Sequence, residues 1–287
     1  MQRQALPTLP RGSAIEWLKD AFMGGTGKPF LTQYDLATPK WPKDYPPLKL
    51  IFLSDLHVGC PAMTLERLGG LVDRVNTLKP DLILLGGDYL NDEGSPNGPY
   101  VSPRDMAKVL RGLKASFRHG VCGVGGNHDA HKKTEVFQVF RENGIIMFEN
   151  DAMKFNHPDR PQQKVYVAGL ADDLTGTIDL AKTFEKARGA EPLILLEHNP
   201  SAFDAIAAFS DRAVVTLAGH THGAQVDGPG RRLMDLPGNA PWKYVLGHSV
   251  VNGSNFIVSS GMGTSGLPLR VNCPARIVEV VLRHSPA

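Results

Sequence analysis

The stretch LKLIFLSDLH, residues 48–57, holds the two features from which the fold of this chain is best inferred. Residues 48–53 form a short, mostly apolar run, which is typical of a strand buried within a sheet. Ser54 and Asp55 end this run at a turn, and His57 follows two residues later. We therefore expect a buried strand whose exit turn carries side chains able to bind a metal ion.

Apolar runs of the same kind recur along the chain and alternate at first with helical patterns. Strands are expected within residues 81–85 and 120–124, and at Val165–Gly169, Leu193–Leu196, Ala213–Leu217, Asn255–Ser259 and Ile277–Leu282. Helices are expected from Thr64 to Val75, from Met106 to Leu113, and around residues 178–187 and 201–208. Alternation of strands and helices, followed by more closely spaced strands, predicts an α/β fold with a sheet-rich second half.

Residues 1–47 differ from the rest and are expected to form an N-terminal arm. The segment RGSAIEWLKDAF, residues 11–22, favours a short helix. The segment TPKWPKDYPP, residues 38–47, favours an extended path because its prolines exclude a regular helix. One domain is expected over residues 48–287. Within it, residues 227–255 form a long, weakly patterned stretch, which is typical of a functional or mobile loop.

The composition limits the classes of partner. With 31 Lys and Arg against 29 Asp and Glu, the net charge of +2 argues against a nucleic-acid binder. Cys60, Cys122 and Cys273 have no metal-binding spacing and indicate reduced thiols. No run is apolar and long enough for a signal peptide or a membrane span. We expect a cytoplasmic protein, in which the amphipathic residues 14–22 offer at most a peripheral contact with a membrane.

Metal-competent side chains follow five of the expected strands, at the ends where loops of an α/β sheet converge on ligands. The residues concerned are Asp55, His57, Asp88, Asn127, His128, Asp129, His198, His220 and His222. A mixed set of oxygen and nitrogen ligands suits Mn²⁺, Fe or Zn²⁺ better than Mg²⁺ or Ca²⁺. The set is large enough for two divalent metal ions.

Each of these residues also has a purely structural explanation. Asp55 and Asp88 are suitable helix N-caps, Asn127 is a suitable turn residue between glycines and helix, and His198 is a suitable partner for a strand end. For any one residue alone the structural explanation is at least as good. For all of them together it requires the same coincidence at every strand exit, so a metal site is the better hypothesis.

The motifs DLH, GGDYLND, GGNHD, EHNP and GHTHG, in this order, resemble the five motifs of the calcineurin-like metallophosphoesterases. The resemblance covers roughly residues 48–282. The later stretch SSGMGTSGLPLRVNCPARI, residues 259–277, is similar to a bacterial branch of small phosphodiesterases that includes YkuE and YaeI. The resemblance implies a four-layered αββα sandwich, in which two mixed β-sheets are flanked by helices.

The resemblance also implies roles for the residues at the strand exits. One metal ion would be held by Asp55, His57 and His222, and the other by Asn127, His198 and His220, with Asp88 bridging the two. His128 would face the substrate as a proton donor, oriented by the carboxylate of Asp129. Asn91 stands where the second motif usually has an acid, and Asp92 follows one place later. Asn91, His131 and Arg270 are the candidate substrate contacts.

The expected function is hydrolysis of a phosphodiester or pyrophosphate bond by a hydroxide that bridges the two metal ions. A lipid-linked nucleotide sugar is one small-molecule substrate that the resemblance suggests. A phosphomonoesterase on the same fold is the alternative enzyme, and a catalytically silent metal-binding scaffold is the non-enzymatic alternative. The complete set of ligand types and the presence of His128 favour an enzyme.

Overall fold

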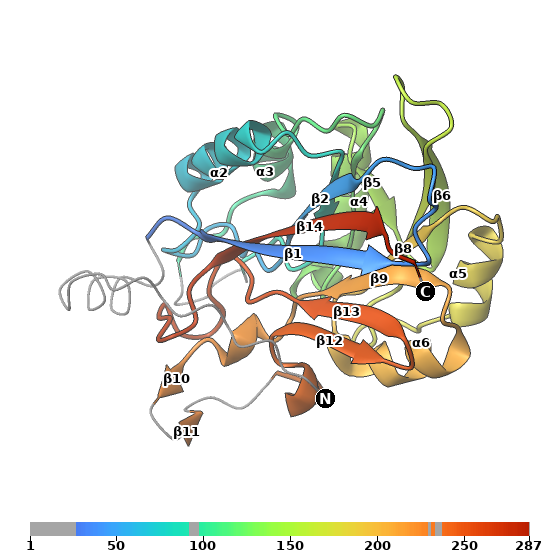
Figure 1. Ribbon diagram of the computed structural model, residues 1–287. Helices are drawn as coiled ribbons and strands as arrows, with labels where there is room; N and C mark the ends of the chain where they lie inside the picture. Colours follow the sequence, from blue (N-terminus) through green and yellow to red (C-terminus); the bar gives the residue numbers. More distant parts are fainter. Residues whose placement is uncertain (1–26, 92–97, 229–230, 233–236, 287) are drawn as a thin grey trace.

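The computed structural model of the chain describes residues 27–91, 98–228, 231–232 and 237–286. The helix expected at residues 11–22 and the residue Asp92 lie outside this part of the chain. Two six-stranded sheets pack face to face, and helices cover the outer face of each (Figure 1). The predicted αββα sandwich with two mixed sheets is thereby confirmed.

The first sheet has the strand order β1-β14-β2-β3-β4-β5. Its strands are β1 (Phe30–Thr38), β14 (Arg276–His284), β2 (Leu48–Leu53), β3 (Leu82–Leu85), β4 (Val121–Val124) and β5 (Ile146–Phe148). Strands β2 to β5 run parallel to one another, while β14 runs antiparallel to β2 and pairs in parallel with β1. The carboxyl ends of β2, β3 and β4 therefore share one edge of the molecule.

The second sheet has the strand order β12-β13-β9-β8-β7-β6. Its strands are β12 (Gly247–Val251), β13 (Ser254–Val258), β9 (Ala213–Ala218), β8 (Leu193–Leu196), β7 (Lys164–Gly169) and β6 (Asp151–Asn156). Strands β7, β8, β9 and β13 are parallel, and the edge strands β6 and β12 are antiparallel to their neighbours. A two-stranded ribbon of β10 (Asp227–Gly228) and β11 (Arg231–Arg232) stands apart from both sheets.

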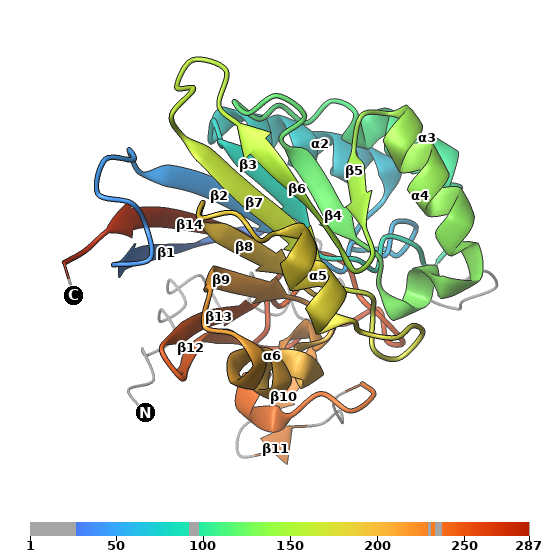
Figure 2. The ribbon, with the colours of Figure 1, turned by 90° about the vertical axis from the view of Figure 1, so that its right-hand side faces the viewer.

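Five α-helices form the two outer layers of the described fold (Figure 2). The first sheet is covered by α2 (Leu65–Thr77), α3 (Pro103–Leu110) and α4 (Lys133–Glu142), and the second by α5 (Leu180–Lys186) and α6 (Phe203–Phe209). Short 3₁₀ turns occupy Asn127–Lys132, Pro200–Ala202, His222–Ala224 and Trp242–Tyr244. Among the described residues, no helix combines the length and the apolar character needed to cross a bilayer.

Strand β2 shows why the stretch that opens at residue 48 is apolar nearly throughout. Leu50 and Phe52 belong to the core between the two sheets, whereas Ile51 and Leu53 pack in the core beneath the helices α2, α3 and α4. All four side chains are almost completely buried. A strand buried on both faces needs apolar residues at successive positions, and each such side chain stabilises the fold by roughly 1.5–3 kcal/mol.

Strand β1 corrects the assignment of residues 30–38 to an arm. This segment pairs along its length with β14, which lies almost 250 residues later in the chain, and Gln33 donates a hydrogen bond to Glu279 at 2.7 Å. Its sequence, FLTQYDLAT, lacks strict alternation because it forms an edge with a half-exposed surface. The proline-rich residues that follow are irregular as expected, and Trp41 is buried among them.

We predict that Phe52→Ala lowers the free energy of unfolding by about 3–5 kcal/mol, because it leaves a cavity between the sheets. Val250→Ala in β12 is the matched control, since that side chain is 56% exposed and should change the value by less than about 0.5 kcal/mol. Urea unfolding followed by circular dichroism measures both. Equal effects of the two substitutions would contradict the described core.

Candidate metal centre

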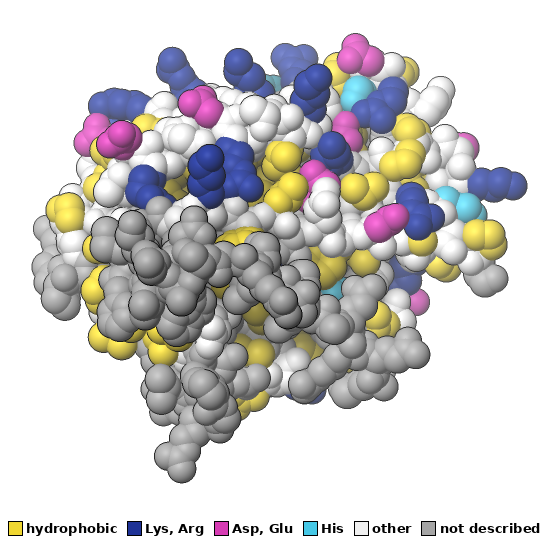
Figure 3. All heavy atoms as spheres, turned by 60° about the vertical axis from the view of Figure 1, so that its left-hand side comes forward, with side chains coloured by type: hydrophobic (Ala, Val, Ile, Leu, Met, Phe, Trp, Pro, Cys, Tyr) yellow, Lys and Arg dark blue, Asp and Glu magenta, His cyan; other side chains and the backbone are white. Residues whose placement is uncertain are grey.

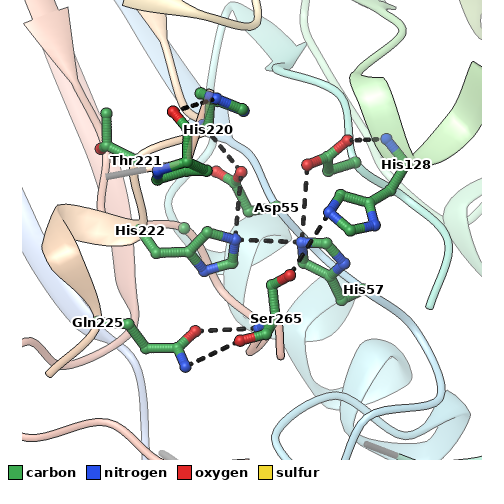
Figure 4. A network of polar contacts seen from close by, with 12 residues as sticks. Asp55, His57, His128, His220, Thr221, His222, Gln225 and Ser265 are labelled. Atoms are coloured by element: carbon green, nitrogen blue, oxygen red, sulfur yellow. Dashed lines mark hydrogen bonds and ion pairs between the residues drawn. The ribbon is translucent and has the colours of Figure 1, made fainter. Parts of the chain in front are cut away.

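The site lies where the carboxyl ends of strands from both sheets meet (Figure 4). Asp55 and His57 follow β2, Asp88 follows β3, and Asn127 begins the turn after β4. His198 follows β8 of the second sheet, and His220 and His222 follow β9. All seven predicted ligands are therefore delivered to one place, although they are spread over more than 160 residues of sequence.

The backbone at these positions is strained in a way that turns the side chains inward. Five residues adopt a positive φ although none is glycine, namely Asp55 at 52°, His57 at 42°, Asp88 at 54°, His220 at 66° and His222 at 50°. Such conformations cost on the order of 1–3 kcal/mol each and persist where the surroundings enforce them. Strained residues gathered at one edge of the fold indicate a functional site.

Two glycines of the motifs make room for the carboxylates. A Cβ atom on Gly126 would collide with the Asp88 carboxylate, and one on Gly219 would collide with the Asp55 carboxylate. The short, sharp turns after β4 and β9 therefore require glycine because of close approach to an acidic side chain. Close approach to these carboxylates explains why Gly126 of GGNHD and Gly219 of GHTHG are glycine.

The first group of possible ligands consists of Asp55, His57 and His222, all of them buried. The Nε2 atoms of His57 and His222 lie 3.1 Å apart, and Asp55 Oδ1 lies 3.7 Å from His222 Nε2. The second oxygen of Asp55 is buried without a hydrogen-bond partner in the described structure. A buried carboxylate oxygen in this situation is costly unless a proton or a cation lies beside it.

The second group consists of Asp88, His198 and His220, with Asn127 beside them. His198 Nε2 lies 3.1 Å from Asp88 Oδ2, 3.2 Å from Asn127 Oδ1 and 3.2 Å from His220 Nδ1. Asp88 Oδ2 also lies 3.7 Å from His57 Nε2 in the first group. The carboxylate of Asp88 thus lies between the two groups.

Hydrogen bonds to backbone carbonyls fix the tautomers of three of the imidazoles. His57 Nδ1 contacts Leu90 O at 3.1 Å, His198 Nδ1 contacts Gly86 O at 2.7 Å, and His220 Nε2 contacts Pro237 O at 3.1 Å. Because a carbonyl only accepts hydrogen bonds, each of these ring nitrogens is a donor. In the neutral ring the opposite nitrogen carries a lone pair directed into the site, as in metal-binding histidines.

The electrostatics of the site favour neutral rings for two histidines. Burial and the neighbouring His198 lower the pKa of His220 to about 4. Burial also lowers the pKa of His222 well below its ordinary value, and His57 and Arg270 add to this effect. Both rings therefore present lone pairs at neutral pH.

The carboxylate of Asp88 reverses this effect at His198. Burial lowers the pKa of His198, but Asp88 outweighs burial and raises that pKa well above its ordinary value. A cation beside Asp88 would supply the same charge compensation and displace the proton.

The donor set fits divalent cations. Ring nitrogens 3.1–3.2 Å apart are at the separation expected for two ligands on one ion at bond lengths of about 2.0–2.1 Å. The geometry and the unpartnered Asp55 oxygen are therefore suited to metal binding, and Asp88 lies between the two groups of possible ligands.

Asp129 makes its hydrogen bonds to the turns after β3 and β4. Its buried carboxylate accepts hydrogen bonds from four backbone N–H groups, those of Asp88 (2.9 Å), Tyr89 (2.9 Å), Leu90 (3.2 Å) and Gly126 (3.0 Å). The carboxylate is thereby bound to the turns after β3 and β4, and its role in orienting the His128 ring stays a prediction. Its hydrogen bond to Asp88 N also holds the backbone of Asp88 in place.

His128 lies half-buried beside a hollow of about 150 Å³ at the site. Its backbone N–H donates to Asp88 Oδ1 at 2.9 Å, and its ring packs edge-on against His57 with centroids 4.8 Å apart. The ring is also close enough to His57 and Asp88 to complete a third group of possible ligands. Its position in the wall of the hollow is the one that the sequence predicts for a group facing the substrate.

The three candidate substrate contacts do not line the hollow. Asn91 is buried and its amide donates to Gly98 O at 3.0 Å. His131 is exposed at the far end of the 3₁₀ turn that begins at Asn127. Arg270 is buried and donates to the carbonyls of Ser260 and Gly263 at 2.6–2.9 Å. Contact of these three side chains with a substrate stays a prediction; Arg270 Nη2 also lies 3.3 Å from His222 Nδ1.

The hollow is lined instead by several residues that the sequence did not single out. In addition to Asp88, His128, His220 and His222, they are Thr221, Ala224, Gln225, Pro237, Ser265 and Gly266. Three of these positions lie inside motifs already quoted, since Thr221 separates the paired histidines, and Ser265 and Gly266 belong to residues 259–277. The motifs identify the segments that form the site. Turn geometry decides which side chains of those segments face the hollow.

Two adjacent clusters of Asp, Asn and His at the strand ends of an αββα sandwich define a metal-binding α/β protein. Residues 48–224 match the calcineurin-like phosphoesterase family, and the chain belongs to that family of metal-dependent phosphoric ester hydrolases. The family resemblance predicted from the five motifs is therefore confirmed.

Curated relatives show the same relationship. The chain is 28% identical to "Uncharacterized metallophosphoesterase YkuE" of Bacillus subtilis, with 88% of this chain and 85% of that protein covered, which confirms the YkuE-like branch. It is 28% identical to "Transmembrane protein with metallophosphoesterase domain" of Danio rerio, with 90% of this chain and 58% of the relative covered. An uncharacterized metallophosphoesterase of Helicobacter pylori is also 28% identical, over 91% of this chain and 66% of the relative. The chain thus spans 58–66% of the length of these last two relatives.

A solved structure is also similar. The calcineurin-like phosphoesterase YfkN from Bacillus subtilis has 14% sequence identity and a TM-score of 0.46, with 76% of this chain and 82% of that chain covered.

We predict that Asp88→Ala abolishes the binding of metal ions at both positions, because Asp88 lies between the two groups of ligands. Metal analysis by mass spectrometry after dialysis against Mn²⁺ measures the stoichiometry. Asp211→Asn, a change of an exposed carboxylate in the turn before β9, is the control and should leave the stoichiometry unchanged. Wild-type stoichiometry in Asp88→Ala would contradict the shared position.

We further predict that Asp129→Asn weakens metal binding by roughly 10- to 100-fold, as is usual when a group that orients a ligand is lost. The amide would present donors to backbone N–H groups that now find an acceptor, so the Asp88 turn should loosen. Calorimetric titration with Mn²⁺ gives the affinity. An unchanged affinity combined with reduced turnover would contradict this prediction and favour the role at His128 that the family resemblance implies.

Proposed function

We propose that this chain hydrolyses a phosphodiester or pyrophosphate bond with two divalent cations. One cation would be held by Asp55, His57 and His222, and the other by Asn127, His198 and His220, with Asp88 shared. The observation that carries this proposal is the position of one buried carboxylate between two groups of imidazole nitrogens at 3.1–3.2 Å spacing. Mixed N and O ligands favour Mn, Fe or Zn ions.

Divalent cations held by these residues would lower the pKa of a bound water toward neutrality and offset the negative charge of the phosphoryl oxygens. The residues of the chain supply the remaining functions. His128 stands at the wall of the hollow and donates a proton to the leaving oxygen as its bond to phosphorus breaks. The leaving group then departs as a neutral alcohol or as a protonated phosphate, and solvent returns the proton to the ring.

The charge of the hollow supports a diester over a monoester. Apart from the possible metal ligands and His128, its lining side chains are uncharged, and no Lys or Arg belongs to the described lining. Lys and Arg side chains lie along the upper part of the face drawn in Figure 3. Arg104 and Lys108 of α3 are among the exposed basic residues. A phosphodiester monoanion needs less charge compensation than a monoester dianion.

The alternatives make different demands on the site. A phosphomonoesterase would need a further cationic group for the second charge of its substrate. A silent scaffold would need neither His128 in the wall nor a hollow beside the ligand groups, and both are present. A lipid-linked nucleotide sugar is a substrate compatible with hydrolysis of a pyrophosphate bond. Its lipid part would bring the protein into peripheral contact with a membrane. A cytoplasmic location is part of the same proposal and is compatible with three free cysteines.

Hydrolysis of bis-p-nitrophenyl phosphate compared with p-nitrophenyl phosphate tests the proposal directly. The protein loaded with Mn²⁺ should cleave the diester with the higher kcat/KM, and EDTA should abolish both activities. A preference for the monoester would establish the alternative enzyme. No turnover of either ester, or of a nucleotide-sugar pyrophosphate, by protein that retains two metal ions would favour the silent scaffold.

We predict that His128→Ala lowers kcat by about 10²- to 10⁴-fold, the usual contribution of a positioned proton donor. The variant should still bind two metal ions, which metal analysis verifies. His131→Ala is the matched control, because that histidine lies in the same 3₁₀ turn but is exposed outside the hollow. Full activity of His128→Ala toward substrates with alkyl leaving groups would remove His128 from the mechanism.

A further inference from the structure

Ser265 lies across the hollow from His128, in the segment between β13 and β14. Its hydroxyl oxygen is 3.4 Å from His128 Nε2, and both side chains line the hollow (Figure 4). Ser265 is half-buried, so the hydroxyl is held by the protein on one side and open to the hollow on the other. The contact joins residues 137 positions apart in the sequence.

The side chain of Gln225 clamps the backbone of Ser265. Its Oε1 accepts a hydrogen bond from Ser265 N at 3.0 Å, and its Nε2 donates to Ser265 O at 3.1 Å and to Leu267 O at 2.8 Å (Figure 4). Gln225 itself adopts a φ of 46° with a ψ of −44°, which is strained for a residue other than glycine. Three hydrogen bonds from one side chain offset this strain and fix the position of Ser265.

The other end of the same segment is anchored to the turn after β2. Gly263 N donates to Asp55 O at 2.7 Å, and Thr264 N donates to Cys60 Sγ at 3.4 Å. Ser265 is therefore held between the turn that carries Asp55 and the turn that carries His220 and His222. This placement holds the hydroxyl beside His128.

We propose that Ser265 is a positioning residue, which holds the His128 ring so that its Nε2–H faces the leaving oxygen of a bound phosphoester. The proposal rests on the proposed function, in which His128 donates that proton. Gln225 serves the same purpose one step further away, because it fixes the backbone of Ser265.

The length of the contact suits this role. A separation of 3.4 Å is at the long end of hydrogen bonding, so the Ser265 oxygen orients the N–H group without binding it tightly. A leaving oxygen that gains negative charge is a stronger acceptor than a hydroxyl and takes over the hydrogen bond as the reaction proceeds. Catalytic contacts of this kind are commonly long before substrate binds.

The test compares Ser265→Ala with wild-type protein loaded with Mn²⁺, on a diester with a p-nitrophenyl leaving group and on one with an alkyl leaving group. An alkoxide needs its proton far more than a nitrophenolate does. We therefore expect kcat for the alkyl ester to fall by roughly 10- to 100-fold, and kcat for the nitrophenyl ester to fall far less. Ser265→Thr, which keeps a hydroxyl, should restore most of the activity. Ser249→Ala in β12, away from the lining of the hollow, is the control and should match the wild type.

A double-mutant cycle separates positioning from direct contact with substrate. If Ser265 acts through His128, Ser265→Ala should have no further effect in a His128→Ala background. Equal losses in both backgrounds would overturn the proposal, as would an unchanged kcat for the alkyl ester in Ser265→Ala. Metal content and melting temperature should remain those of the wild type, since a loss of either would mark Ser265 as structural.

A second measurement distinguishes failure of the role proposed for Ser265 from failure of the proposed function. In spectra of ¹⁵N-histidine-labelled protein, Ser265→Ala should shift the His128 Nε2 resonance while leaving those of His131 and His248 in place. An inactive wild type with this shift would overturn the proposed function alone. An active wild type without the shift would overturn the role of Ser265 alone.

Discussion

The structure depends on charge compensation around one buried carboxylate. Asp88 is almost completely buried and lies within 3.1–3.7 Å of imidazole nitrogens from both groups of possible ligands. Burial raises its pKa, but the surrounding histidines, His198 first, outweigh burial and keep it well below its ordinary value. An ionised carboxylate in such a place requires positive charge nearby. The two cation positions proposed here meet that requirement, and the arrangement of turns, glycines and backbone donors around Asp88 is consistent with it.

Two parallel sets of strands make this arrangement possible. A single sheet brings together the carboxyl ends of its own strands, and here the first sheet contributes Asp55, His57, Asp88 and Asn127 while the second contributes His198, His220 and His222. The site therefore lies across the junction of the sheets, and its geometry depends on the core between them. That core is built from large apolar side chains such as Phe52, Leu196 and Leu217, which set the spacing of the strand ends. Packing far from the site is in this way coupled to the separation of the ligands.

Much of the fold and most of the ligand set could be predicted from the sequence, because both depend on local signals. Buried strands are apolar runs, and the residues at their exits are few and chemically distinctive. Strand β1 was missed because it is an edge strand stabilised by pairing with β14, and nothing within residues 30–38 reports that distant partner. The hydrogen-bond partners of Asp129 and Arg270 could not be predicted for a related reason. Both residues have suitable chemistry near the site, but the direction in which each side chain points is decided by backbone groups of other segments.

Two charged residues beside the site make most of their hydrogen bonds to the backbone. Asp129 accepts from four backbone N–H groups, and Arg270 donates to carbonyls of the segment that precedes Ser265. The peptide groups in the turns after the strands have no hydrogen-bond partners in a sheet. The two charged side chains supply such partners and thereby stabilise the turns. Because they are committed to the backbone, the walls of the hollow are left to Thr221, Gln225 and Ser265, which are polar but uncharged. Because these lining side chains are uncharged, the negative charge of a substrate would be recognised by bound cations and by His128. The proposed preference for a phosphoryl group with one negative charge, rather than two, is based on this distribution of charge.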